Sequence, residues 1–307
     1  MYLEHFGLKE FPFSLTPNTE YFLNMASYHK AYNMLMVSIA NREGFIKVVG
    51  EVGTGKTMMC RTVLNALEHD AERYVTAYIA NPVLSPKGLF LAFAEELGIE
   101  VDTDIGHHSL LKRISKVLME HALSDRQVIL FIDEAHAMPR KTLEALRLLT
   151  NLETEKSKLF QVVLFAQPEL DEMLREKSLR QLLQRITFSY KLESLDRDGV
   201  HRYVSHRMAK AGYNGPDVFS SKALDDLFAV SQGIPRIINI LCHKALMVAY
   251  GRGDRMVDRL HMQKAIDDTE GVEYVKSDSQ SMRLATVSLA LIGGAVALYL
   301  LSYYLRS

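Results

Sequence analysis

The segment GEVGTGKT, residues 50–57, has the residue types and spacing of a loop that binds the phosphates of a nucleotide. Its glycines let backbone N–H groups turn toward one anion, and the start of the following helix adds to their field. Lys56 is placed to reach the β- and γ-phosphates, and the Thr57 hydroxyl is placed to ligate Mg²⁺. We therefore predict that the chain binds a nucleoside triphosphate. The residues expected to contact it are Gly50, Glu51, Val52, Gly53, Thr54, Gly55, Lys56, Thr57 and Met58.

A second reactive group follows the apolar run VILFI at residues 128–132, which is typical of a buried parallel strand. A carboxylate at the end of such a strand can hold Mg²⁺ through water, and the next carboxylate can polarise an attacking water. We predict that Asp133 joins Thr57 in a metal site and that Glu134 is the catalytic base. His136 is interpreted as a residue at the start of the next helix, not as a catalyst. The letters DEAH also occur in a class of helicases, but the other helicase motifs and the second motor domain are missing.

Alternating strands and helices must position these residues. The predicted strands are Ile46–Val49, Tyr74–Ile79, Val128–Ile132, Gln161–Phe165 and Thr187–Leu192. The helices predicted beside them are Tyr28–Ala40, Thr57–Ala71, Pro86–Leu97, Ser109–Ala122, Arg140–Leu152 and Glu169–Gln184. This alternation predicts an α/β fold with a parallel sheet that is covered by helices on both faces.

Beyond residue 194 the strand signals stop, and four helical patterns predict a helical lid. They are Arg197–Ala211, Ser220–Val230, Pro235–Ala249 and Arg259–Thr269. The chain is therefore divided as follows: an N-terminal segment, 1–43; the phosphate-loop core, 44–194; the lid, 195–270; a juxtamembrane linker, 271–283; and a transmembrane helix, 284–305.

The transmembrane prediction rests on residues 284–305, which contain no charged side chain and are long enough to cross a bilayer as a helix. Arg283 and Arg306 flank the segment, and three tyrosines lie toward its far end. The alternative is a buried helix at the end of a soluble fold, which would normally show a polar face. We expect a single-pass inner-membrane protein with its ATPase domain in the cytoplasm.

Composition restricts the function less sharply. The chain has 307 residues, of which 48% are hydrophobic, and a formal net charge of -1. This charge gives no global argument for binding nucleic acid, so no nucleic-acid partner is expected. Cys60 and Cys242 are far apart and match no metal or redox spacing.

Further motifs make the chain resemble the AAA+ ATPases, which combine a phosphate-loop core with a helical lid. The strand FQVVLF leads to AQPEL, so the resemblance implies that Gln167 is the sensor that contacts the γ-phosphate or its water. The motif GIPR resembles a second sensor, which implies that Arg236 reaches the nucleotide from the lid. LRQLLQR precedes the last strand and implies an arginine finger toward a neighbouring subunit, with Arg185 favoured and Arg180 as the other choice.

A more specific resemblance, within the AAA+ ATPases, is to the ExeA/GspA-like membrane-associated ATPases. It rests on the combination of YLEHFGLKEFPFSLTPNTEYF, GEVGTGKT, LRLLTNLET, FAQPEL and LRQLLQRI. That resemblance covers residues 1 to about 270 and implies work in type II secretion or a related pilus system. Such proteins typically continue into a peptidoglycan-binding domain, whereas this chain stops at Ser307, so no such domain is expected. A short form with a terminal anchor resembles the ATPases of mannose-sensitive haemagglutinin (MSHA) pilus assembly.

The expected function is therefore hydrolysis of ATP with Mg²⁺, by a homo-oligomer, in support of pilus or secretion-apparatus assembly proteins at the inner membrane. One alternative is a DNA-linked regulatory ATPase of the transposition target-selection type, for which a membrane anchor has little use. The other is a nucleotide-gated scaffold with little turnover.

Overall fold

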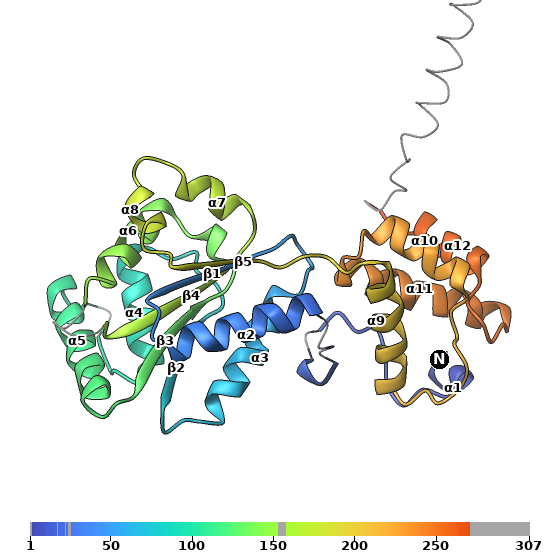
Figure 1. Ribbon diagram of the computed structural model, residues 1–307, viewed down its shortest axis with the longest axis horizontal. Helices are drawn as coiled ribbons and strands as arrows, with labels where there is room; N and C mark the ends of the chain where they lie inside the picture. Colours follow the sequence, from blue (N-terminus) through green and yellow to red (C-terminus); the bar gives the residue numbers. More distant parts are fainter. Residues whose placement is uncertain are drawn as a thin grey trace, which may run out of the picture.

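The computed structural model describes residues 2–16, 18–21, 23, 26–102, 104–152 and 158–270. Figure 1 shows two lobes joined side by side, with the sheet in one and helices α9–α12 in the other. The strands are β1 (Phe45–Val49), β2 (Tyr74–Ile79), β3 (Gln127–Ile132), β4 (Phe160–Ala166) and β5 (Phe188–Lys191). The helices of the N-terminal segment and the sheet lobe are α1 (Tyr2–Phe6), α2 (Ala26–Ala40), α3 (Lys56–Glu68), α4 (Pro86–Glu96), α5 (His107–Leu123), α6 (Arg140–Leu149), α7 (Glu169–Leu174) and α8 (Arg180–Leu183), with 3-10 turns η1 (Thr19–Tyr21) and η2 (Ala135–Ala137). The lid helices are α9 (Arg197–Lys210), α10 (Ser221–Ser231), α11 (Pro235–Arg252) and α12 (Arg259–Asp267).

The five strands form one parallel sheet in the order β2-β3-β4-β1-β5. This confirms the predicted α/β class. Because all strands run the same way, the loops that follow them meet at one edge of the sheet. The ends of the central strands are also aligned: Ile132 of β3 pairs with Leu164 of β4, and Val49 of β1 pairs with Ala166 of β4.

Alternate residues of the central strands enter two separate hydrophobic clusters, as the pleat of a strand requires. Ile129 and Phe131 of β3 pack in the first cluster, with α2, α3 and the lid helices. Val128, Leu130 and Ile132 face the second cluster, with α4, α5 and α6. The sheet is therefore buried on both faces, which explains why its central strands read as continuous apolar runs.

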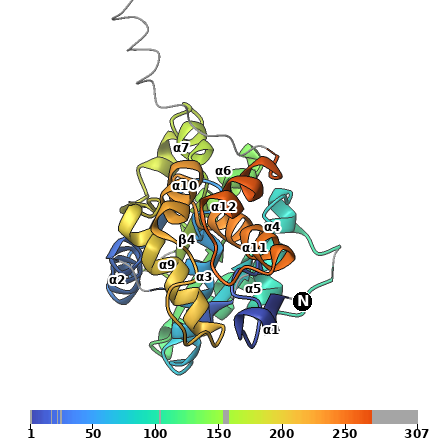
Figure 2. The same cartoon turned by 90° about the vertical axis from the view of Figure 1, so that its right-hand side faces the viewer.

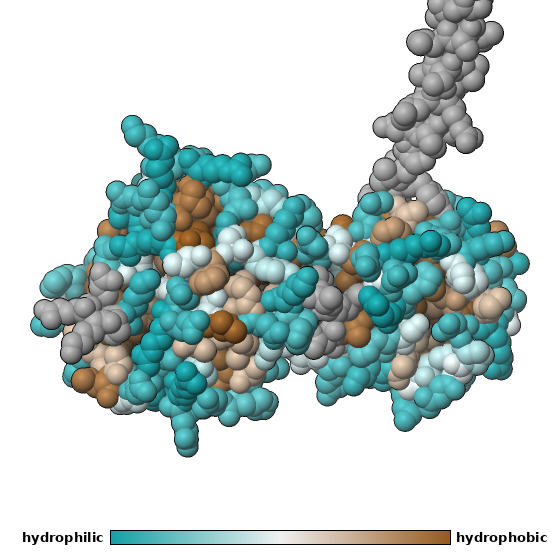
Figure 3. Space-filling model, viewed as in Figure 1, coloured by the Kyte–Doolittle hydropathy of each residue, from teal (hydrophilic) through white to brown (hydrophobic). Residues whose placement is uncertain are grey.

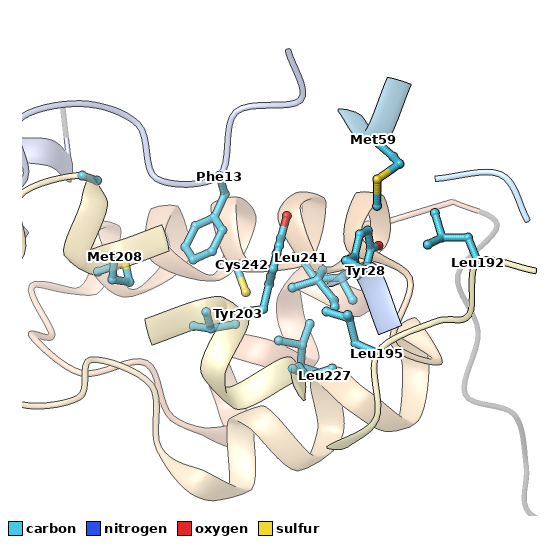
Figure 4. Packing of buried hydrophobic residues seen from close by; sticks show 14 of the residues in the cluster. Phe13, Tyr28, Met59, Leu192, Leu195, Tyr203, Met208, Leu227, Leu241 and Cys242 are labelled. Carbon is cyan, nitrogen blue, oxygen red and sulfur yellow. The ribbon is translucent and has the colours of Figure 1, made fainter. Parts of the chain in front are cut away.

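The first cluster extends without a break into the lid. Tyr28, Leu195 and Met59 belong to the same cluster as Leu227 and Leu241 of the lid, and Figure 4 shows them packed together. This shared core fixes the second lobe against the first. On the face seen in Figure 3 both lobes are largely hydrophilic, with smaller hydrophobic areas.

The N-terminal segment is divided between the two lobes. Residues before η1 pack on the lid: the Lys9 N–H donates to the Ala211 carbonyl (2.8 Å), and the rings of Phe13 and Phe219 lie edge to face at 6.0 Å. Figure 2 shows α1 beside α11, and the Tyr2 hydroxyl lies 2.9 Å from Nδ1 of His243 near the middle of that helix. Helix α2, by contrast, packs beside α3 in the sheet lobe.

One predicted helix is two helices in the structure. The segment expected as a single helix at 169–184 is divided into α7 and α8. Its buried leucines are Leu170, Leu174, Leu179 and Leu182. A step of five residues, from Leu174 to Leu179, would rotate a continuous helix by about 140° and turn the second pair away from the core. The chain breaks between them, and all of these leucines face the second cluster.

The predicted single-pass inner-membrane protein, with its ATPase domain held at the membrane by a C-terminal transmembrane helix, needs correction. The predicted span, residues 284–305, lies outside the described residues. Among the residues that the structure does describe, no helix is both long enough and apolar enough to cross a bilayer. That finding overturns the localisation inferred from hydropathy.

Candidate nucleotide-binding site

The strand order brings the predicted chemical groups to one edge of the sheet. The Gly50 N–H donates to the Ala166 carbonyl (3.1 Å) as the phosphate loop leaves β1. The Asp133 N–H donates to the Ile79 carbonyl (3.0 Å) as the chain leaves β3. Because β4 lies between β1 and β3, Gln167 emerges between the phosphate loop and the two carboxylates.

Lys56, the first residue of α3, lies inside the phosphate loop. Its ammonium donates to the carbonyls of Gly50 (2.9 Å) and Glu51 (3.0 Å), so the lysine is held at the centre of the loop. Burial lowers the pKa of Lys56, and the nearby carboxylates of Glu134 and Asp133 oppose that shift. A buried cation held only by carbonyl oxygens is a strong binding partner for an anion.

Thr57 and Asp133 bring two oxygen ligands together. The Thr57 hydroxyl donates to Oδ2 of Asp133 (2.7 Å), while Oδ1 accepts the Glu134 N–H (2.9 Å). Burial raises the pKa of Asp133 in spite of these hydrogen bonds, so the ionised carboxylate lacks compensating charge. Hydroxyl and carboxylate oxygens fit Mg²⁺, which commonly takes one or two protein ligands together with water and phosphate. The described residues contain no group of three or more His, Cys, Asp or Glu that could hold a metal ion.

Glu134 and Gln167 face each other across the same edge. The Gln167 side-chain amide donates to Oε2 of Glu134 (3.3 Å). The backbone of Glu134 is left-handed, with φ 50°, which is uncommon for a residue with a side chain. Such strained backbone is typical of functional sites, where the surrounding structure holds it in place.

The lid contacts the phosphate loop directly through Arg236. The Arg236 N–H donates to the Gly53 carbonyl (3.2 Å), and a Cβ added at Gly53 would lie 2.6 Å from Cβ of Arg236. Gly233 is held as tightly on the other side, where an added Cβ would lie 1.9 Å from the Leu195 carbonyl oxygen. Both glycines have positive φ, 80° and 73°. No side chain larger than glycine fits either position, so the turn that leads into α11 and Arg236 is held between the phosphate loop and the linker to the lid.

These groups border a cavity of about 330 Å³ between the two lobes. The predicted residues that line it are Val52, Gly53, Gly55, Lys56, Thr57, Met58, Glu134, Gln167 and Arg236. Other predicted residues do not line the cavity but contact the residues that do. Asp133 is reached through Thr57, the carbonyls of Gly50 and Glu51 hold Lys56, and the buried Thr54 hydroxyl donates to the Glu51 carbonyl (2.8 Å).

The far end of the cavity is built from residues that sequence reasoning missed. They come from the N-terminal segment and the lid: Ser14, Leu15, Thr16, Tyr21, Leu23, Tyr28, Leu195, Tyr203, Arg207, Pro235 and Asn239. Arg207 is 4% exposed, and its guanidinium donates to the carbonyls of Pro12 and Ser14 and to the Tyr203 hydroxyl. The Tyr203 hydroxyl lies 3.1 Å from Oδ1 of Asn239. The only signal in the sequence was the aromatic content of the first residues.

The two candidate finger arginines lie outside this cavity. Arg185 donates to the Thr150 hydroxyl (2.9 Å) and to the side-chain oxygen of Asn151, at the end of α6. Arg180 is exposed at the start of α8. A role for either arginine in the site of a neighbouring subunit stays a prediction.

The fold and the site together define the class: a P-loop NTPase of the AAA type. Residues 39–174 match the family model described as AAA domain. Over 272 residues the chain is 40% identical to General secretion pathway protein A of Aeromonas hydrophila. The alignment covers 89% of this chain and 49% of that protein, so the chain spans about half the length of its relative. The resemblance seen in the sequence motifs is confirmed, and the chain is an ExeA/GspA-like AAA protein.

Solved structures show the same fold. The ORC2 protein of Aeropyrum pernix superposes with a TM-score of 0.63 at 14% identity, covering 92% of this chain and 78% of that one. The Holliday junction branch migration motor RuvB of Thermotoga maritima gives a TM-score of 0.55 at 15% identity, covering 84% and 73%. At such low identity the likeness shows the fold alone.

Proposed function

We propose that the chain hydrolyses ATP and that this hydrolysis supports the assembly of a type II secretion apparatus or of a type IV, MSHA-like pilus. The observation that carries the enzymatic part is the single cavity edge where Lys56, Thr57, Glu134 and Gln167 converge. A cation for the phosphates and a carboxylate for the water then border one space, as phosphoryl transfer to water requires.

In this mechanism Lys56 and the loop N–H groups hold the phosphates, and Thr57 and Asp133 would hold Mg²⁺. The metal supplies charge that neutralises the phosphate oxygens. Glu134 takes a proton from the attacking water, and Gln167 donates a hydrogen bond that positions the water or contacts the γ-phosphate. Arg236 reaches the nucleotide from the lid; among the described residues no hydrogen bond or ion pair holds its guanidinium.

The first test compares the full chain with Glu134→Gln. Glutamine keeps the shape of the side chain but cannot accept the proton, so turnover should fall by about 10²- to 10⁴-fold while ATP binding is retained. Glu144→Gln, on α6, is the control. Hydrolysis by Glu134→Gln at the wild-type rate would refute the base assignment, and an inactive wild-type chain that still binds ATP would favour the nucleotide-gated scaffold.

We also propose that the active form is a homo-oligomer in which Arg185 completes the site of a neighbouring subunit. It is supported by the position of Arg185, which lies outside the cavity of its own subunit, beside Thr150. A guanidinium delivered across an interface would stabilise charge on the transferred phosphoryl group, as arginine fingers do.

Mixed oligomers test this assignment. Arg185→Ala should lower the turnover number by on the order of 10³-fold without loss of ATP binding. Mixing it with Lys56→Ala subunits should restore activity, since each contributes the part that the other lacks. No recovery in mixtures shown to co-assemble would count against Arg185, and recovery specific to Arg180→Ala mixtures would move the role to Arg180.

The biological part of the proposal is supported by the relative's printed name, which places that protein in general secretion. It is tested in cells that lack this chain. Wild type should restore secretion or pili, whereas Glu134→Gln, expressed at the same level, should not. Full restoration by Glu134→Gln would show that hydrolysis is not what the apparatus needs.

A further inference from the structure

His136 lies two residues beyond the proposed base, in the 3-10 turn η2, and its side chain is 18% exposed. Its imidazole touches two groups of the site. The backbone N–H of Gln167 donates to Nδ1 (3.3 Å), and Nε2 lies 3.4 Å from Oε2 of Glu134. The ring therefore lies between the residue after β4, Gln167, and the second residue after β3, Glu134.

These contacts select one tautomer of the neutral ring. An N–H group that points at Nδ1 requires that nitrogen to be an acceptor, so the ring proton of the neutral form is on Nε2. Nε2 then carries its N–H beside the carboxylate of Glu134, in a polar contact that is longer than a hydrogen bond. The hydrogen bond from the Gln167 backbone thus fixes which ring nitrogen of His136 carries the proton beside Glu134.

Glu134 has reason to need such support. Its side chain is 43% exposed, and an exposed carboxylate on a two-carbon stem samples several rotamers. The Gln167 amide donates to Oε2 (3.3 Å), and Nε2 of His136 lies 3.4 Å from the same oxygen. Among the described residues Oε1 has no hydrogen bond, which leaves one oxygen anchored and the other available to take a proton.

The helix-start interpretation does not account for this geometry. Helix α6 begins at Arg140, after Pro139, and has no side-chain cap. The His136 side chain instead turns toward the base.

We propose that His136 is a positioning residue for ATP hydrolysis: its ring lies between the backbone of Gln167 and the carboxylate of Glu134 and holds that carboxylate in place. This inference rests on the proposed function, because it assigns a role within that reaction. His136 itself takes no proton from the water.

Two substitutions of similar size separate this role from simple packing. In His136→Gln the side-chain N–H₂ extends about as far as Nε2 and can still donate to Glu134. In His136→Asn the side chain ends near the position of Nδ1 and leaves Glu134 without that donor. Both remove the ring, so a loss confined to the asparagine variant reports on the polar contact with Glu134.

The measurement is single-turnover hydrolysis of ATP by the full chain, with the Kd for ATP measured in parallel. His136→Asn should hydrolyse bound ATP roughly 10- to 100-fold more slowly with a Kd within about twofold of wild type, since misplacing a catalytic group costs rate and not binding. His136→Gln should recover most of the rate. His121→Asn, a partly buried histidine of α5, is the control and should leave the rate unchanged.

A double variant completes the test. Once Glu134→Gln has removed the base, adding His136→Asn should cause no further loss, because the two residues act as a unit. Equal rates for the asparagine and glutamine variants, a loss that appears in Kd alone, or additive losses with Glu134→Gln would each overturn the inference while the proposed function stands. If wild type binds ATP without hydrolysing it, both fall together.

Discussion

Buried charge is used differently at the two ends of the cavity. At the phosphate end, burial lowers the pKa of Lys56 and raises the pKa of Asp133, so both groups are ionised against the preference of their surroundings. At the lid end, Arg207 is just as buried, but its guanidinium donates to the Pro12 carbonyl, the Ser14 carbonyl and the Tyr203 hydroxyl. It also lies over the rings of Tyr21 (4.7 Å) and Tyr203 (5.6 Å).

The difference shows what each end contributes. A buried charge without a matching partner costs stability and is retained for what it will bind. A buried charge that donates to protein acceptors from each of its nitrogens joins distant parts of the chain, here the N-terminal segment and helix α9. We therefore expect substitutions at the phosphate end to remove function without lowering stability, and substitutions at the lid end to lower stability.

The largest effect is expected from Lys56→Ala. Loss of the ammonium should weaken ATP binding by roughly 30- to 5,000-fold, since truncating one partner of a buried charge pair typically costs about 2–5 kcal/mol. The Tm without nucleotide should be unchanged or higher, because the variant no longer buries a cation. Calorimetric titration and thermal unfolding measure the two quantities, with Lys141→Ala on the surface of α6 as the control. Equal ATP affinity in the variant and wild type would show that the buried charge of Lys56 is not kept for binding phosphate.

Arg207→Met should show the opposite pattern. Methionine keeps part of the apolar stem but leaves the Pro12 and Ser14 carbonyls without their donor, so the free energy of unfolding should fall by about 3 kcal/mol. Chemical denaturation of the full chain measures this, and Arg202→Met, on the exposed side of the same helix, is the control. If Arg207→Met is as stable as Arg202→Met, the guanidinium does not join the two segments.

Tyr203→Phe tests one link of the same network at smaller cost. The hydroxyl connects Arg207 to Asn239, and its removal should lower the free energy of unfolding by about 1 kcal/mol. Tyr213→Phe, whose exposed hydroxyl donates to the Pro216 carbonyl, should cost less than about 0.5 kcal/mol. Equal losses in both variants would mean that the buried position adds nothing to this hydrogen bond.

The phosphate end could be predicted from the sequence because its chemistry is local. The residues that bind phosphate follow one another within GEVGTGKT, and Asp133 and Glu134 are adjacent after an apolar run. Parallel strands then bring separate loops to one edge, so strand positions and motifs together place most of the site. The strands themselves lie within one or two residues of their predicted bounds.

The lid end could not be predicted in this way. Arg207 and the carbonyls it binds are separated by more than 190 residues, and no spacing within either segment indicates the other. In the sequence, Tyr203 and Arg207 are one aromatic and one basic residue of a predicted helix, and their spacing indicates no shared partner. The contact of His136 with Gln167 could not be predicted for the same reason, since Gln167 lies 31 residues away, after a different strand.

The smallest effect, and the one most specific to the comparison, is expected from Asp133→Asn. Because burial raises the pKa of Asp133 above its unfolded value, the folded state favours the protonated form. Its stabilising effect is therefore present at acid pH and is lost as pH rises through the folded pKa, so at neutral pH the ionised carboxylate costs stability. Asparagine has nearly the same shape, and its carbonyl can still accept the Glu134 N–H.

The Tm of Asp133→Asn at pH 7.5, without nucleotide, should therefore rise by about 2 °C, as expected when a functional residue is held at a cost in stability. The gap from wild type should close as pH falls, because both side chains are then neutral. Asp171→Asn is the matched control: Asp171 pairs with the buried Lys47, so losing its charge should lower the Tm. A lower Tm for Asp133→Asn at pH 7.5 would show that the Thr57 and Glu134 hydrogen bonds outweigh desolvation. The carboxylate would then hold this end of the cavity together much as Arg207 holds the other.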